Sequence, residues 1–234
     1  MSALLGVILA GGEGRRMGGP KDGVPVPGGT LLSRAWNALA PVGSPVILQG
    51  GASAPPGMDA APDLRSGEGP LAGLEAALVR AREAGSPGVA VLAVDLPRVT
   101  APVVLELARR WRDLPAPDTS AVVADTRRGM QPLAGIYGAG LAPELARWLD
   151  TGSQRAARAW ADSLGDRILA VPEADLTEVA GHPEPFLNVN RPGHVERAMD
   201  LAPPAPPMVS VTGWKDSGKT TVAVGLAAEL RGRG

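Results

Sequence analysis

The feature that most constrains the fold is the alternation of short apolar runs with helical patterns along the first 200 residues. We expect strands at 3–10, 45–49, 88–94, 120–124, 133–137 and 168–171, and helices at 31–40, 71–84, 101–111, 141–150, 153–164 and 194–201. Strands buried on both faces and separated by helices predict an α/β fold, a three-layer Rossmann-like sandwich with a mostly parallel sheet. Right-handed crossovers would bring the loops after the strands to one edge, where such sheets bind ligands.

Composition excludes several classes of protein. The chain of 234 residues carries a net charge of −1 and no basic tract, so we expect no nucleic-acid partner. No apolar run approaches the roughly 20 residues that span a bilayer, and the N-terminus has no export signal, so we expect no membrane partner and a cytoplasmic location. Cysteine is absent, which rules out disulfides, thiolate metal sites and cysteine nucleophiles. The two histidines, His182 and His194, show no metal-ligand spacing and are expected at the surface.

A glycine-rich loop follows the first predicted strand and contains five glycines, two arginines and a lysine between residues 9 and 21. Glycines let backbone N–H groups approach a ligand closely, and Arg15, Arg16 and Lys21 add cationic side chains. Oriented donors of this kind match the charge of a triphosphate. On pattern alone, a tight turn with solvated arginines remains the alternative.

A second phosphate-binding pattern lies near the end of the chain. Four prolines at 202–207 predict a linker between a domain at 1–201 and a segment at 208–234. That segment carries a full Walker A match, in which Gly213, Gly218 and Lys219 would cradle phosphates and Thr220 would bind Mg²⁺. The residues after Thr220 are too few to supply the metal-orienting Asp and further strands of a working P-loop NTPase. We therefore expect an incomplete P-loop segment that is not a catalytic unit.

Several motifs together resemble one enzyme family. Five motifs occur in order along the chain. They are Leu-Ala-Gly-Gly at 9–12 with its later Arg and Lys, Gly-Pro-Leu-Ala-Gly at 69–73, Asp-Leu-Pro at 95–97, Pro-Leu-Ala-Gly-Ile-Tyr at 132–137 and Phe-Leu-Asn-Val-Asn-Arg-Pro at 186–192. They resemble the signature of the molybdenum cofactor guanylyltransferases, which have the nucleotide-diphospho-sugar transferase type of fold. The P-loop segment resembles the opening of the molybdopterin-guanine dinucleotide adaptor GTPase. One departure is Pro20, where the family often has Asp before the lysine.

The resemblance implies the following roles. Asp95 would bind Mg²⁺, which takes one or two carboxylates plus phosphate oxygens and water. Arg15 and Lys21 would offset charge at the reacting phosphates. The nucleotide would contact Leu9, Ala10, Gly11, Gly12, Lys21, Asp63, Gly69, Pro70, Leu71 and Asp95.

Other candidates keep a structural alternative. Asn188 and Asn190 would orient a phosphate, ribose or metal-bound water, or would form Asx-turns before the last helix. The alternative for Asp63 is a solvated loop residue. Without the family match, the alternative for Asp95 is a turn residue whose side chain is hydrogen-bonded to its own backbone. Arg155 matches a family position that is associated with the pterin-side substrate. The arginines at 109, 110, 127 and 128 are expected to be solvated.

The function that the resemblance implies is transfer of GMP from GTP to the molybdenum cofactor, with release of pyrophosphate. GTP and molybdopterin are then the substrates, and molybdoenzymes or their chaperones would receive the product. Two alternatives stay open. One is another small-molecule nucleotidyltransferase, cytidylyl on molybdopterin or guanylyl on phospholactate. The other is a non-catalytic GTP-binding adaptor.

Overall fold

The centre of the molecule is a seven-stranded sheet of mostly parallel strands. The computed structural model describes residues 3–10, 23–26, 29–49, 59–65, 67–152, 155–190 and 192–200. The strands are β1 (Leu4–Leu9), β4 (Gly43–Gln49), β5 (Asp59–Ala61), β6 (Gly88–Ala93), β7 (Ala121–Thr126), β8 (Gly129–Gly138) and β9 (Ile168–Pro172). Their order is β5-β4-β1-β6-β8-β7-β9, and β8 alone runs antiparallel to both of its neighbours among these strands. The predicted mostly parallel sheet is confirmed.

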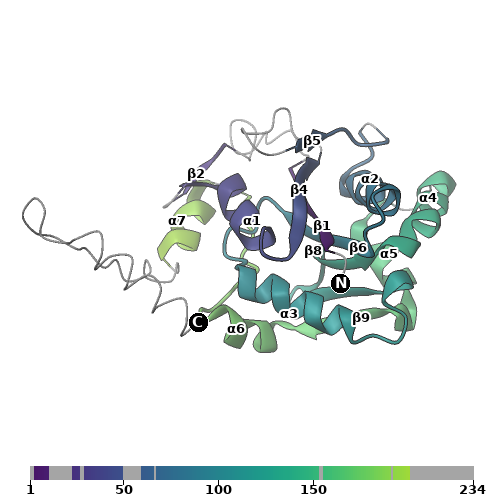
Figure 1. Cartoon of the computed structure of the whole chain (residues 1–234). Coiled ribbons are helices and arrows are strands. Elements are labelled where there is room, and N and C mark those ends of the chain that lie inside the picture. The colour runs from purple at the N-terminus through teal and green to yellow at the C-terminus, as the bar shows by residue number, and fades with distance from the viewer. Residues whose placement is uncertain are drawn as a thin grey trace, which may run out of the picture. The chain divides into compact units, whose positions relative to one another are not determined.

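Helices cover both faces of this sheet and make three layers (Figure 1). They are α1 (Leu31–Leu39), α2 (Pro70–Glu83), α3 (Ala101–Arg112), α4 (Ala142–Thr151), α5 (Ala157–Ser163), α6 (Glu173–Ala180) and α7 (Pro192–Asp200). Side chains from α1, α3, α6 and α7 join one buried cluster. Those from α2, α4 and α5 join a second cluster. A short ribbon of β2 (Pro25–Val26) and β3 (Gly29–Thr30) precedes α1.

Strand β1 shows how the sequence builds this arrangement. All of its residues are buried, as expected of a strand covered on both faces. Successive side chains of a strand point to opposite faces. Accordingly Leu4 and Ile8 belong to the cluster with α1 and α3, whereas Val7 and its alternating neighbours belong to the cluster with α2.

The structure corrects some sequence-based expectations. The helix predicted at 153–164 begins only at Ala157, because Ala156 has extended backbone angles. His182, expected at the surface, is only 5% exposed. Strand β5 and helix α6 were not predicted. The tryptophans at 111 in α3 and 160 in α5 are buried.

The chain divides into two units, residues 1–202 and 203–234. The second unit, with the predicted P-loop segment, lies outside the described residues. In the part of the chain that the structure describes, no helix is long and apolar enough to cross a bilayer.

Candidate active site

The carboxyl ends of β1, β4, β5 and β6 meet at one edge of the sheet, because these four strands are parallel. Leu9 ends β1 and Ala10 follows it, while Asp95 lies two residues beyond the end of β6. The Val94 amide donates a hydrogen bond of 3.0 Å to the Leu9 carbonyl. This bond holds the loop that carries Asp95 beside the end of β1.

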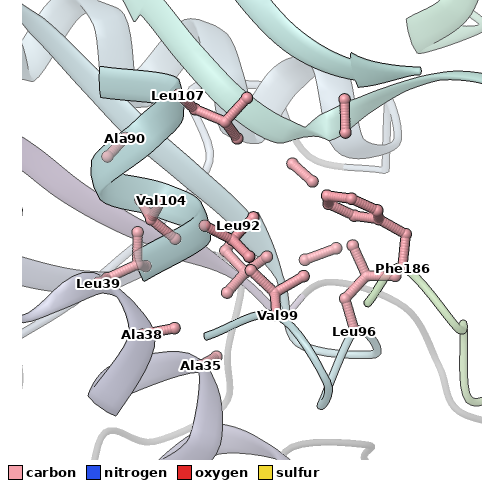
Figure 2. Close-up of a cluster of buried hydrophobic side chains, with 14 of the residues drawn as sticks. Ala35, Ala38, Leu39, Ala90, Leu92, Leu96, Val99, Val104, Leu107 and Phe186 are labelled. Carbon is pink, nitrogen blue, oxygen red and sulfur yellow. The ribbon is translucent and has the colours of Figure 1, made fainter. Parts of the chain in front are cut away.

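A second backbone bond brings the asparagines to the same place. The Val189 amide donates to the carbonyl of Asp95 at 2.8 Å, so Asn188 and Asn190 flank a residue bonded directly to Asp95. Apolar packing reinforces this contact. Leu96 and Phe186 belong to one buried cluster (Figure 2). Three predicted site residues from distant parts of the sequence are thereby gathered at one point.

The Asp95 side chain and its surroundings fit a hard cation. Asp95 is half-buried with a buried Oδ1 atom, and the Oδ1 atom of Asn188 is buried without accepting a hydrogen bond from any described residue. No group of three or more His, Cys, Asp or Glu that could hold a metal occurs in the described ranges. Mg²⁺ needs no such cage, since it is usually bound by one or two carboxylates with substrate phosphates and water. One carboxylate whose backbone carbonyl is bonded to the asparagine segment is consistent with that chemistry.

The start of α2 contributes the glycine-rich element at 69–71. Gly69 precedes the helix with φ +78° and ψ −168°, a conformation almost confined to glycine, and Pro70 occupies the first turn. Leu71 is fully buried in the same cluster as Leu9. The first N–H groups of a helix have no partner within the helix and attract anions. The helix start therefore suits a phosphate or carboxylate at this edge.

The loop between β5 and α2 is tied down by ion pairs. Arg65 forms two hydrogen bonds with the carboxylate of Glu75, at 2.8 and 3.0 Å, and a further ion pair of 2.7 Å with Asp150 of α4. Glu75 is only 3% exposed. Asp63 lies two residues before this arginine and is half-buried. The clamp fixes the loop on which Asp63 and Gly69 lie.

Arg155 lies beside the same loop. Its guanidinium contacts the carboxylate of Glu68 at 3.3 Å, and Glu68 is the residue before Gly69. Arg155 itself is half exposed. The structure thus places Arg155 next to the start of α2. Nothing in the sequence singled out Glu68, whose Oε2 atom is buried without a hydrogen bond from the described residues.

Sequence reasoning also missed Arg98, a buried arginine three residues after Asp95. It donates hydrogen bonds to the segment that leads to the asparagines. The signal available in the sequence was its position directly after Asp-Leu-Pro.

Other predicted site residues lie outside the described residues. They are Gly11, Gly12, Arg15 and Lys21 of the first loop, and Gly213, Gly218, Lys219 and Thr220 of the P-loop. For these residues the sequence-based roles stay predictions.

The parallel strands and the residues gathered at their carboxyl ends define the class of α/β proteins that bind ligands at this edge of the sheet. The chain belongs to the MobA-like NTP transferase domain family, whose model matches residues 6–168. A relative from Opitutus terrae, named a probable molybdenum cofactor guanylyltransferase, is 36% identical over 84% of this chain and 95% of its own length.

Solved structures agree with the fold. The molybdopterin-guanine dinucleotide biosynthesis protein A of Archaeoglobus fulgidus has a TM-score of 0.70 and 23% identity over 85% of this chain and 98% of that one. A Mycobacterium tuberculosis protein solved in complex with manganese has a TM-score of 0.57 and 22% identity, over 85% and 98% of the two chains. At these identities the likeness establishes a common fold.

Proposed function

We propose that this protein transfers GMP from GTP to the molybdenum cofactor and releases pyrophosphate. The observation that carries the proposal is the pair of backbone bonds, Val94 to Leu9 and Val189 to Asp95, which join the end of β1, the Asp95 loop and the asparagine segment. The names of relatives more than 30% identical over most of the chain support the same substrates.

The chemistry needs no protein nucleophile. An oxygen of the terminal phosphate of molybdopterin bonds to the α-phosphorus of GTP, while the bond from that phosphorus to the bridging oxygen breaks and its electron pair leaves with pyrophosphate. Positioning and charge neutralisation supply most of the catalysis in such transfers. The protein must therefore hold two anionic substrates in line and offset their charge.

Different site residues would position the substrates and offset their charge. Leu9, Ala10, Gly11 and Gly12 would contact the nucleotide together with Asp63, Gly69, Pro70 and Leu71. Arg15 and Lys21 would offset charge on the α-phosphate and on the leaving pyrophosphate. Asn188 and Asn190 would orient phosphate or ribose oxygens beside Asp95, and Arg155 would contact the pterin-side substrate.

Asp95 would hold Mg²⁺, with the amide oxygen of Asn188 directed at the ion or at its water. A bound Mg²⁺ ion supplies charge neutralisation across the phosphates. The manganese in the mycobacterial structure of similar fold supports a divalent cation. We also infer that the enzyme works in the cytoplasm and passes its product to molybdoenzymes or their chaperones.

The test is formation of the dinucleotide by purified protein with Mg²⁺, molybdenum cofactor and either GTP or CTP. We expect the guanine dinucleotide and an equal amount of pyrophosphate from GTP, and little product from CTP. Transfer from CTP but not from GTP would overturn the nucleotide assignment. In a parallel reaction with phospholactate in place of the molybdenum cofactor we expect no transfer, and transfer to phospholactate but not to molybdopterin would overturn the acceptor assignment.

A binding experiment separates this enzyme from a GTP-binding adaptor. We expect Lys21→Ala to weaken GTP binding and Lys219→Ala to leave it unchanged, because the first loop and not the P-loop holds the substrate. The reverse pattern would favour the adaptor function.

A further inference from the structure

Arg98 is a buried cation with an unusual set of partners. The residue is only 2% exposed. Its Nε donates to the Glu184 carbonyl at 3.1 Å and its Nη1 to the Ala198 carbonyl at 3.0 Å. Its Nη2 donates to the Nδ1 of His182 at 3.0 Å and to the Pro183 carbonyl. Four donor contacts thus join one side chain to a loop at 182–184 and to the end of α7.

These partners lie on either side of the segment that carries the asparagines. Arg98 belongs to the loop after β6, three residues beyond Asp95, and residues 182–184 immediately precede the asparagine segment. The Leu187 amide bonds to the Glu184 carbonyl at 3.2 Å, which continues the turn into that segment. Helix α7 follows it. The Arg98 guanidinium therefore fixes both ends of the asparagine segment, and the hydrogen bond from Val189 to Asp95 fixes its middle.

The chemistry of this contact requires an arginine. Within the described residues, no carboxylate is hydrogen-bonded to Arg98, and the Glu184 carboxylate is held instead by Arg197 at 3.0 Å. A buried cation is costly unless its donors are satisfied. The planar guanidinium reaches several acceptors at fixed angles, whereas the compact ammonium of lysine cannot span them. A stabilising role alone would be met as well by apolar side chains of similar volume.

We propose that Arg98 is a positioning residue, which holds the segment of Asn188 and Asn190 against Asp95 so that amide and carboxylate oxygens meet one cation. The catalytic consequence rests on the proposed function, but the positioning itself does not. Two experiments therefore address the two parts separately. Both use the full chain.

The first experiment measures hydrogen exchange of the Val189 amide by NMR in wild-type protein, Arg98→Lys and Arg98→Met. Loss of the Arg98 contacts should let the asparagine segment open locally, so we expect hydrogen exchange at Val189 to accelerate at least about tenfold. Amides of β9 should exchange as in the wild type. The matched control is Arg109→Met, an exposed arginine of α3. Unchanged exchange at Val189 in folded Arg98 variants would overturn the inference.

The second experiment separates positioning from stability. Replacing partners that orient metal ligands typically costs about 10–100-fold in metal affinity or activity. We therefore expect the Mn²⁺ concentration for half-maximal transfer to rise by at least about tenfold in Arg98→Lys. The KM for GTP should change far less, because the first loop and the start of α2 bind the nucleotide. Equal Mn²⁺ dependence in Arg98→Lys and the control would contradict the catalytic part.

A milder variant covers the case in which Arg98 replacements do not fold. His182→Leu removes one acceptor and leaves the three carbonyls, so exchange at Val189 should accelerate by a smaller factor. Exchange at Val189 as slow as in the wild type would count against the positioning role of Arg98. If the wild type transfers no nucleotide, the proposed function fails while the exchange measurement still decides the positioning role.

Discussion

At the scale of single residues, the backbone conformation of Gly69 sets the start of α2. Its angles of φ +78° and ψ −168° lie in a region that other residues essentially avoid. A Cβ added there would meet no atom of the described residues within 4 Å, so crowding by these residues does not explain the glycine. The constraint is the conformation itself, which turns the chain into α2 at the carboxyl edge of the sheet.

Gly69→Ala tests this constraint. We expect the free energy of unfolding to fall by about 2 kcal/mol, the usual cost of such strain, and GTP affinity to fall as the start of α2 shifts. Urea denaturation and nucleotide titration measure the two effects. The control is Gly152→Asn at the end of α4, where φ is +64° and ψ is 2°, a conformation that Asn tolerates. Wild-type stability in Gly69→Ala would contradict the argument.

Residues also set the limits of sequence reasoning at the site. Asp95 and the glycines of the α2 start could be predicted, because their chemistry is carried by short local motifs. The burial of His182 and the partners of Arg98 could not, since these contacts join residues more than 80 positions apart in the chain. Burial of a polar side chain depends on tertiary packing, which no local pattern records.

At the scale of elements, strand existence was predictable and strand direction was not. The apolar runs of β1 and β6 are long and buried, so they were predicted within a residue of their observed bounds. The direction of β8 depends on which strands it pairs with, and an apolar run carries no such information. Strand β5 has three residues, which is too short for an alternating pattern. Helix α6 buries Leu176 alone, so its sequence lacks the repeated apolar positions that predict a helix.

The loop between β5 and α2 depends on contacts with two helices, and Arg65→Met tests this coupling. The variant leaves the buried Glu75 carboxylate without its hydrogen-bond partner and releases the loop from α4. We expect a lower thermal midpoint and a KM for GTP raised about tenfold through misplacement of Asp63 and Gly69. Steady-state kinetics and thermal melting measure both. Arg147→Met, an exposed arginine of α4, should change neither. A KM equal to that of the control would show that the clamp does not position the loop.

At the scale of the whole molecule, stability should fall in acid through two groups of residues. Burial, with repulsion from Arg98 and Arg34, lowers the pKa of His182 below 6.5. The unfolded chain then binds a proton that the folded chain excludes, so this contribution is lost as the pH falls below 6.5. Hydrogen bonds from Arg109 and Arg110 lower the pKa of Glu106 from 4.5 to about 2, so its contribution is lost between those values.

We therefore expect the free energy of unfolding to decrease from pH 7 to pH 5 in the wild type and to decrease less in His182→Asn. The asparagine amide oxygen can still accept from Arg98 but does not titrate. Below pH 4.5, Glu106→Gln should show a weaker dependence than the wild type. Chemical denaturation at each pH provides the measurement. An identical pH dependence in wild type and His182→Asn would exclude His182 as the source.

At this scale the sheet edge, the Asp95 carboxylate and GMP transfer belong to one proposed site. The most direct test is the rate of dinucleotide formation in Asp95→Asn. With GTP, Mg²⁺ and molybdenum cofactor, we expect kcat to fall by at least about a hundredfold, as for loss of a preorganised charge in an active site. Asp162→Asn, an exposed acid on α5, should retain the wild-type rate. Asp95→Asn with wild-type kcat and an unaltered Mg²⁺ requirement would contradict the account.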